Sequence, residues 1–161
     1  MPNTLIIGFG NMDRADDGVA FAVVNALRCR LGQQALPEDE TGLDALGSPV
    51  DSVFLLQLTP DLMDVMGRYE RIVFVDAHVD ENMDDLHCGP VLPEQATLTF
   101  THHMSPEMLL ALFKVLHARE PAGYLVSIRG HDFDFHRRLS PDTASQVEPA
   151  VERILRLAED D

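Results

Sequence analysis

The sequence is short of cysteine, of basic residues and of long hydrophobic runs, and each shortage excludes a class of protein. Its 161 residues contain two cysteines, Cys29 and Cys88, too few for a disulfide framework or a thiolate zinc site. Lysine and arginine number 12 against 27 acidic residues, and the formal net charge of −15 repels nucleic-acid phosphates and anionic lipid. We therefore expect no nucleic-acid partner and no membrane partner.

The longest apolar runs, at residues 5–7 and 72–75, fall far below the roughly 20 residues that a transmembrane helix needs. Residues 1–4 lack the basic region of a signal peptide. We therefore expect a cytoplasmic protein. With 45% hydrophobic residues, the chain is of a size and composition that fits one domain over residues 1–161.

Strand and helix patterns alternate along the chain. Hydrophobic runs predict strands at residues 4–9, 50–58, 71–75, 96–101 and 124–129. Apolar spacing predicts a helix over residues 17–31, and a hydroxyl residue followed by proline predicts further helix starts at Thr59-Pro60, Ser105-Pro106 and Ser140-Pro141. Residues 32–49, 77–95 and 130–139 are predicted connections. This alternation predicts a three-layer α/β/α sandwich with a mostly parallel, mixed sheet of about five strands.

The first strand leads into a glycine-rich turn, Gly8-Phe9-Gly10-Asn11, of the kind that binds nucleotides. A dinucleotide fingerprint needs a third glycine three positions after the second, and that position is Asp13. Asp16 and Asp17 follow, where they would repel a phosphate at the start of the helix. A nucleotide-binding module is therefore a hypothesis that rests on the glycines alone.

Acids and histidines stand at the ends of predicted elements. Asp76 closes a hydrophobic strand, and ligands of open α/β sheets bind beyond the carboxyl ends of strands. If the first and third strands are neighbours, Asp17 shares that edge. His102 and His103 precede the helix start at Ser105, and adjacent residues of an extended chain point to opposite faces, so we expect one of them to face the acids. Two carboxylates and an imidazole suit nickel, zinc or iron, with coordination positions left open.

These motifs together resemble the hydrogenase maturation proteases, the endopeptidases that trim the C-terminus of the large subunit of nickel-iron hydrogenases. The matching motifs are Gly8-Phe9-Gly10-Asn11 with Asp16-Asp17-Gly18, Val75-Asp76-Ala77, His103 to Pro106, and Leu139-Ser140-Pro141. The resemblance implies that Asp17, Asp76 and His103 bind metal and form the catalytic site. His102 is the alternative ligand to His103, Asp16 is a further catalytic candidate, and Glu107 is a further candidate ligand.

The resemblance also implies where the metal comes from. The protease recognises nickel already installed in the large-subunit precursor and removes the C-terminal extension, and zinc or another divalent ion is able to substitute. The alternative is a non-catalytic nickel- or precursor-binding maturation chaperone on the same scaffold. Many members of the family have Asp-Gly-Gly after the second strand, where this chain has Gln57-Leu58-Thr59-Pro60, so we expect recognition of the client to differ.

Overall fold

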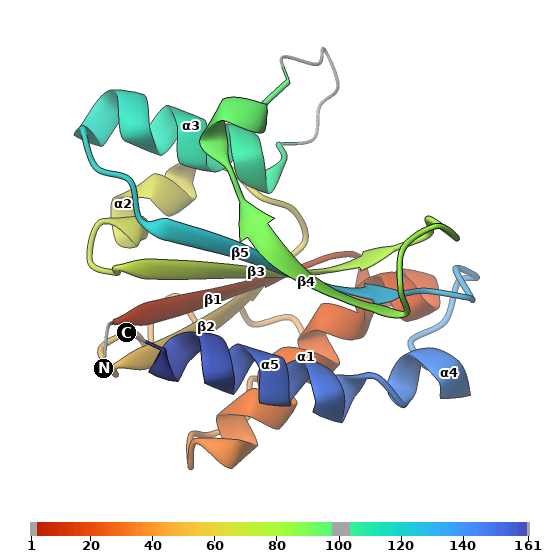
Figure 1. Ribbon diagram of the computed structural model, residues 1–161. Coiled ribbons are helices and arrows are strands. Elements are labelled where there is room, and N and C mark those ends of the chain that lie inside the picture. Colours follow the sequence, from red (N-terminus) through yellow and green to blue (C-terminus); the bar gives the residue numbers. More distant parts are fainter. Residues whose placement is uncertain (1–2, 98–103, 161) are drawn as a thin grey trace.

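One mixed sheet of five strands forms the centre of the protein in the computed structural model, which describes residues 3–97 and 104–160 (Figure 1). The strands are β1 (Thr4–Phe9), β2 (Val50–Leu55), β3 (Arg71–His78), β4 (Leu86–Val91) and β5 (Ala122–Arg129). Their order is β2-β1-β3-β5-β4, and all neighbours are parallel except the antiparallel pair β4 and β5. The predicted fold class is confirmed.

Helices cover both faces of the sheet and complete three layers. The helices α1 (Val19–Arg30) and α5 (Val147–Glu159) lie on one face, and α2 (Met63–Met66) and α3 (Pro106–His117) lie on the other (Figure 1). The short helix α4 (Pro141–Ala144) precedes α5. The segment η1 (Met12–Gly18) consists of two 3-10 turns on either side of a kink, and single 3-10 turns form η2 (Pro60–Leu62) and η3 (Pro93–Gln95). None of the helices within residues 3–97 and 104–160 combines the length and the apolar character that a membrane span requires.

The two faces of the sheet carry separate hydrophobic cores. Val73 and Val75 of β3 belong to the core beneath α1 and α5, whereas Ile72 and Phe74 belong to the core beneath α2 and α3. Because successive side chains of a strand point to opposite faces, Asp76 continues the second set. Burial on both faces explains why this strand is an uninterrupted apolar run in the sequence.

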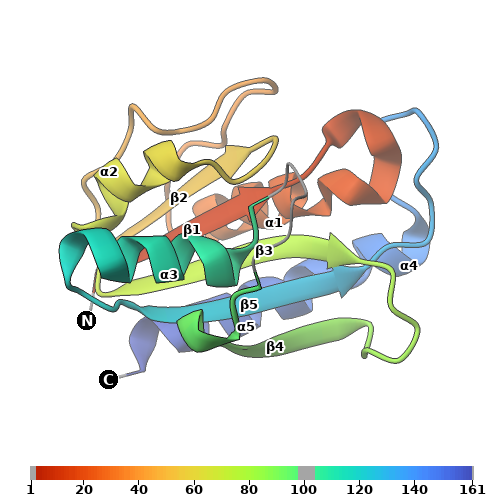
Figure 2. The same cartoon turned by 90° about the horizontal axis from the view of Figure 1, so that it is seen from above.

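The carboxyl ends of the parallel strands meet at one edge of the sheet, seen from above in Figure 2. Gly8 of β1 pairs with Val75 of β3, so the first and third strands are neighbours, as the shared-edge hypothesis required. On the other side of β1, Phe9 pairs with Leu55, the last residue of β2. The turns that follow β1, β2 and β3 are therefore adjacent. Asp17 lies in the turn after β1, and Asp76 lies two residues before the end of β3.

The edge strand β4 differs from the sequence prediction, which assigned residues 77–95 to a connection. Its sequence contains Gly89 and Pro90, residues that weaken the local signal for a strand. β4 is a strand because it pairs with β5 along its whole length, from Leu86 opposite Ile128 to Val91 opposite Gly123. Proline is tolerated because β4 lies at the edge of the sheet.

Other boundaries also differ. β3 runs to His78, so Asp76 lies inside the strand rather than closing it, and β5 begins at Ala122 rather than at residue 124. The strand predicted at residues 96–101 is not found at Ala96 and Thr97, and its other positions lie outside the described residues. β2 ends at Leu55 rather than at residue 58, and α1 begins at Val19 rather than at residue 17 because residues 12–18 form the kinked 3-10 segment η1.

The hydroxyl-proline pairs mark three helix starts, as predicted, but only two of the three hydroxyl side chains cap the helix with a hydrogen bond. Ser105 Oγ accepts a hydrogen bond from Met108 N at 3.1 Å, and Ser140 Oγ accepts one from Thr143 N at 3.4 Å. Thr59 makes no such bond, and the turn that follows is the short η2. A hydroxyl-proline pair therefore predicts where a helix begins and not how long it continues.

Candidate active site

The glycine-rich turn after β1 folds back onto Asp17. Gly10 has φ of 149°, and a Cβ atom there would lie 2.0 Å from the carbonyl oxygen of Asp17, so only glycine fits. Asn11 N donates to Asp17 Oδ2 at 2.8 Å, and Asn11 Oδ1 accepts from Asp13 N at 2.9 Å. The turn thus binds a carboxylate of its own chain at the place where a nucleotide loop would bind phosphate.

Asp17 and Asp76 lie in the same cleft at the carboxyl edge of the sheet. The cleft has a volume of about 740 Å³, and we name it the acid cleft. It is lined by Phe9, Gly10, Asn11, Arg14, Asp17, Leu56, Gln57, Leu58, Asp76, Met104, Ser105 and Pro106. The walls therefore come from the ends of β1, β2 and β3 and from the start of α3, as the strand order predicts.

The carboxyl group of Asp76 is electrostatically unusual. Burial raises its pKa to about 7, a hydrogen bond from Ala77 N at 2.7 Å opposes the rise, and the negative charge of Asp17 adds to it. A cation placed between the two carboxylates would stabilise the ionised form of Asp76. The electrostatics of the cleft therefore favour a positively charged ligand.

The donor set of the acid cleft is suited to a divalent metal ion. Within the described residues, no hydrogen-bond donor contacts Oδ1 of Asp17 or Oδ2 of Asp76, so each carboxylate retains one oxygen for a ligand. Residues 3–97 and 104–160 contain no group of three His, Cys, Asp or Glu side chains that could hold a metal ion by themselves. The third predicted ligand, His103, and its alternative, His102, lie outside the described residues. Met104, the next residue in the sequence, lines the cleft.

Asp16 has a different environment from Asp17. It is fully buried and is not among the residues that line the acid cleft. Its Oδ2 accepts hydrogen bonds from His131 N (2.8 Å), Asp132 N (2.9 Å) and Ser140 Oγ (2.7 Å), and its Oδ1 accepts one from Ser140 N (2.8 Å). The hydroxyl of Thr143 lies 2.9 Å from Oδ2. The carboxylate of Asp16 therefore ties the turn after β1 to residues 131–143.

Three further hydrogen bonds, two between backbone groups and one from a side chain, hold the same two segments together. Ala15 N donates to His136 O at 2.7 Å, Asp16 N donates to Asp132 O at 2.9 Å, and Arg14 Nε donates to Phe133 O at 2.7 Å. Between them, Ala15 has φ of 51° and ψ of −112°, a conformation that costs a non-glycine residue about 1–3 kcal/mol. These hydrogen bonds stabilise the strained backbone, and the strain lies two residues from Asp17.

Glu107 and Arg14 differ from what the sequence predicted for the site. Glu107, a candidate ligand, lies in the first turn of α3 and is not among the residues that line the acid cleft. Arg14 lines the cleft and was not predicted from the sequence. The signal that could have identified it is a single basic residue within an acidic segment, Asp13 to Asp17.

Solved structures match the fold over almost the whole chain, although no protein-family model and no curated protein sequence matches it. The hydrogenase maturating endopeptidase HybD from E. coli is 19% identical with a TM-score of 0.68, covering 96% of this chain and 91% of that one. The NiFe hydrogenase maturation protease HybD from Thermococcus kodakarensis is 19% identical with a TM-score of 0.64, covering 98% and 99%. HycI of the same organism is 14% identical with a TM-score of 0.68, covering 99% and 94%. The chain has the fold of these proteases.

Proposed function

We propose that this protein is a hydrogenase maturation endopeptidase that recognises nickel in the precursor of a nickel-iron hydrogenase large subunit and removes its C-terminal extension. One observation carries the proposal: Asp17 and Asp76, distant in sequence, line one cleft on the fold that these proteases share. We place the reaction in the cytoplasm, where the precursor is synthesised.

The substrate supplies the metal in this proposal. Asp17 and Asp76 each offer one oxygen to the nickel of the precursor, and His103, or His102 in its place, offers the third ligand. Nickel, zinc and other divalent ions accept such a mixed set of oxygen and nitrogen ligands, so zinc is able to replace nickel. A precursor without metal lacks this contact, which restricts cleavage to the loaded form.

The carboxylates also have a role in positioning the peptide bond. A metal shared between the precursor and the cleft fixes the reacting segment relative to Asp17 and Asp76, and its positive charge holds Asp76 in the ionised form that binds it. Asp16 supports this arrangement indirectly, because its carboxylate is engaged by the segment 131–143. We therefore assign Asp16 a positioning role rather than a chemical one.

Cleavage of a nickel-loaded large-subunit precursor, followed by mass spectrometry of the released peptide, tests the proposal. The wild type is expected to cut the precursor, whereas Asp17→Ala, Asp76→Ala and His103→Ala are expected to lose activity at least about 100-fold, as when a transition-state contact is removed. Asp134→Ala, an exposed aspartate in the neighbouring loop, is the control and should cut normally. Equal cleavage by all the variants would falsify the assigned site.

The alternative is a non-catalytic chaperone that binds nickel or the precursor. The departure from the family at Gln57 and Leu58 favours it, because both residues line the acid cleft where many family members have Asp-Gly-Gly. Co-purification distinguishes the two functions: a precursor that binds the wild type, stays uncut and is released by Asp76→Ala supports the chaperone.

A further inference from the structure

Arg14 brings a positive charge into the acid cleft. It is the one basic side chain among the described residues that line the cleft, and it stands within the acidic segment Asp13 to Asp17. An arginine among aspartates is expected to pair with one of them, because its guanidinium fork matches a carboxylate. Nevertheless, Arg14 forms no ion pair with any described carboxylate.

Each of the neighbouring carboxylates is engaged by another group. Asp13 Oδ1 lies 2.8 Å from Nε of Arg137. Asp16 is engaged by donors of residues 131–143, and Asp17 accepts a hydrogen bond from the glycine-rich turn. The three acids therefore leave the charge of the arginine between them available to a ligand of the cleft.

The guanidinium group of Arg14 is nevertheless held in position. Its Nε donates to Phe133 O at 2.7 Å, and its Cζ lies 4.8 Å from the centroid of the Phe135 ring, within the range of a cation–π contact. The two terminal nitrogens donate no hydrogen bond to a described residue. A group that is already positioned and still has free donors binds an acceptor with a small loss of conformational entropy.

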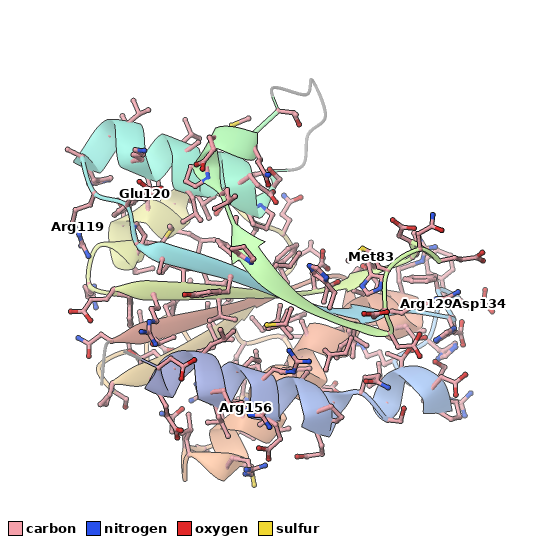
Figure 3. All side chains as sticks on the ribbon, viewed as in Figure 1. Met83, Arg119, Glu120, Arg129, Asp134 and Arg156 are labelled. Atoms are coloured by element: carbon pink, nitrogen blue, oxygen red, sulfur yellow. The ribbon has the colours of Figure 1, made fainter. Side chains whose placement is uncertain are left out.

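The position of Phe135 is explained by this contact and not by the hydrophobic core. Its side chain is 83% exposed, so it contributes little to either core. Phe133 and Phe135 flank Asp134, which Figure 3 labels, in the segment that Asp16 ties to the turn after β1. One loop therefore holds both the backbone beside the cleft and the guanidinium group within it.

We propose that Arg14 binds the peptide that occupies the acid cleft, through hydrogen bonds from its terminal nitrogens to a backbone carbonyl oxygen, and that Phe135 is a positioning residue that acts through Arg14. The presence of a peptide in the cleft rests on the proposed function. A neutral carbonyl is favoured over an acidic side chain, because Asp17, Asp76 and the net charge of −15 repel an anion. Together with the metal, Arg14 gives the peptide two fixed points, which set its orientation.

Steady-state cleavage of the nickel-loaded precursor measures this contact. Arg14→Ala should raise KM about tenfold, the effect of losing a hydrogen bond from a charged donor, and should leave kcat within about threefold of the wild type. Arg14→Lys should recover only part of the loss, since lysine lacks the guanidinium fork. Arg138→Ala is the control: it removes an equal charge from an exposed side chain that has no ion pair or hydrogen bond with the described residues, and it should behave as the wild type.

The salt dependence identifies the acceptor. A carbonyl group has no net charge to screen, so the ratio of KM between Arg14→Ala and the wild type should stay within about twofold from about 0.05 M to about 0.5 M salt. An ion pair with an acidic side chain of the precursor would be screened instead. A ratio that falls to about one in high salt would show that the acceptor is an anion and that the proposal is wrong.

A double-mutant cycle tests the role of Phe135. Phe135→Leu keeps an apolar side chain but removes the ring, and it should raise KM about threefold in the wild type, the size of an exposed cation–π contact. In the Arg14→Ala background the same substitution should change nothing further. Effects that simply add would mean that the ring does not act through Arg14.

An unchanged KM in Arg14→Ala, or a loss confined to kcat, would overturn the proposal. If the wild type binds the precursor without cutting it, the Kd of the precursor replaces KM in each comparison, so the contact is decided without proteolysis. Failure of this contact is distinguishable from failure of the proposed function. If the precursor is cut with the same KM by wild type and Arg14→Ala, the protease stands and the contact does not. If the wild type neither binds nor cuts it, both fail.

Discussion

Asp16→Asn is the substitution for which the structure makes the sharpest quantitative prediction. The amide oxygen of asparagine can replace Oδ2 as an acceptor, but its NH₂ group then faces Ser140 N, which donates to Oδ1 at 2.8 Å. One partly buried N–H group loses its acceptor, which costs about 1–3 kcal/mol, and the remaining bonds lose the strength that a charged acceptor provides. We expect a loss of about 3 kcal/mol in the free energy of unfolding at pH 7.

The pH dependence gives this prediction a second, independent part. Burial by itself raises the pKa of Asp16, but hydrogen bonds from His131, Ser140 and Asp132 more than offset it and lower the pKa from 3.8 to about 2. The folded state therefore favours the ionised form, and its contribution is fully present above about pH 4 and is lost as the pH falls from about 4 to about 2. At 1.36 kcal/mol per pKa unit, this contribution is about 2 kcal/mol.

Equilibrium unfolding in urea, followed by circular dichroism between pH 7 and pH 2, measures both parts. The difference between the wild type and Asp16→Asn should be about 3 kcal/mol at pH 7 and should shrink markedly at pH 2. Asp134→Asn, an exposed change in the loop at the carboxyl end of the sheet (Figure 3), should stay within about 0.5 kcal/mol of the wild type. A difference below about 1 kcal/mol at pH 7, or one that does not change with pH, would refute the reasoning.

Three other expectations concern the glycine turn, a buried hydrogen bond and the metal of the precursor. Gly10→Ala should destabilise the protein by about 3 kcal/mol or more in urea unfolding, because the added Cβ would lie 2.0 Å from the Asp17 carbonyl oxygen; an unchanged midpoint would contradict this. Tyr69→Phe removes the 2.6 Å hydrogen bond from Tyr69 to Asp51 Oδ2, but Gly47 N still donates to the same oxygen. The free energy of unfolding should therefore fall by about 1 kcal/mol. A fall above about 3 kcal/mol would mean that the bond from Gly47 N does not compensate. Removal of nickel from the precursor with a chelator should abolish its cleavage, and added Ni²⁺ should restore it; cleavage of the metal-free form would exclude metal recognition.

Local sequence patterns were sufficient for most of the fold. The strand at Thr4–Phe9, the helix starts at Pro106 and Pro141 and the strand that leads to Asp76 are found as predicted, because each depends on interactions within a few residues. β4 was missed because its stability comes from pairing with β5, whereas its own glycine and proline disfavour a strand. Propensity and pattern describe neighbours in sequence, and edge strands depend on neighbours in space.

The site was predictable to the extent that it follows from strand order. The sequence placed Asp17 in the turn after the first strand and Asp76 at the end of the third. The pairing of β1 with β3 brings both to one cleft, although β3 continues two residues past Asp76. The separate role of Asp16 was not predictable, since its partners are 115 to 127 residues away in the chain. Adjacent aspartates in one motif thus have unlike environments: one faces an open cleft and the other is buried among donors.

The sequence by itself determined most of the strands and helices, the excess of negative charge and the identity of the acids near the carboxyl ends of β1 and β3. The tertiary structure alone decided which acid is available to a ligand, where the edge strand lies, and that Arg137 joins three acidic residues beside the cleft. The physical reason is the distance along the chain over which each interaction acts. Hydrophobic periodicity and capping act over a few residues, whereas burial, pKa and the shape of a cavity depend on segments that meet only after the chain has folded.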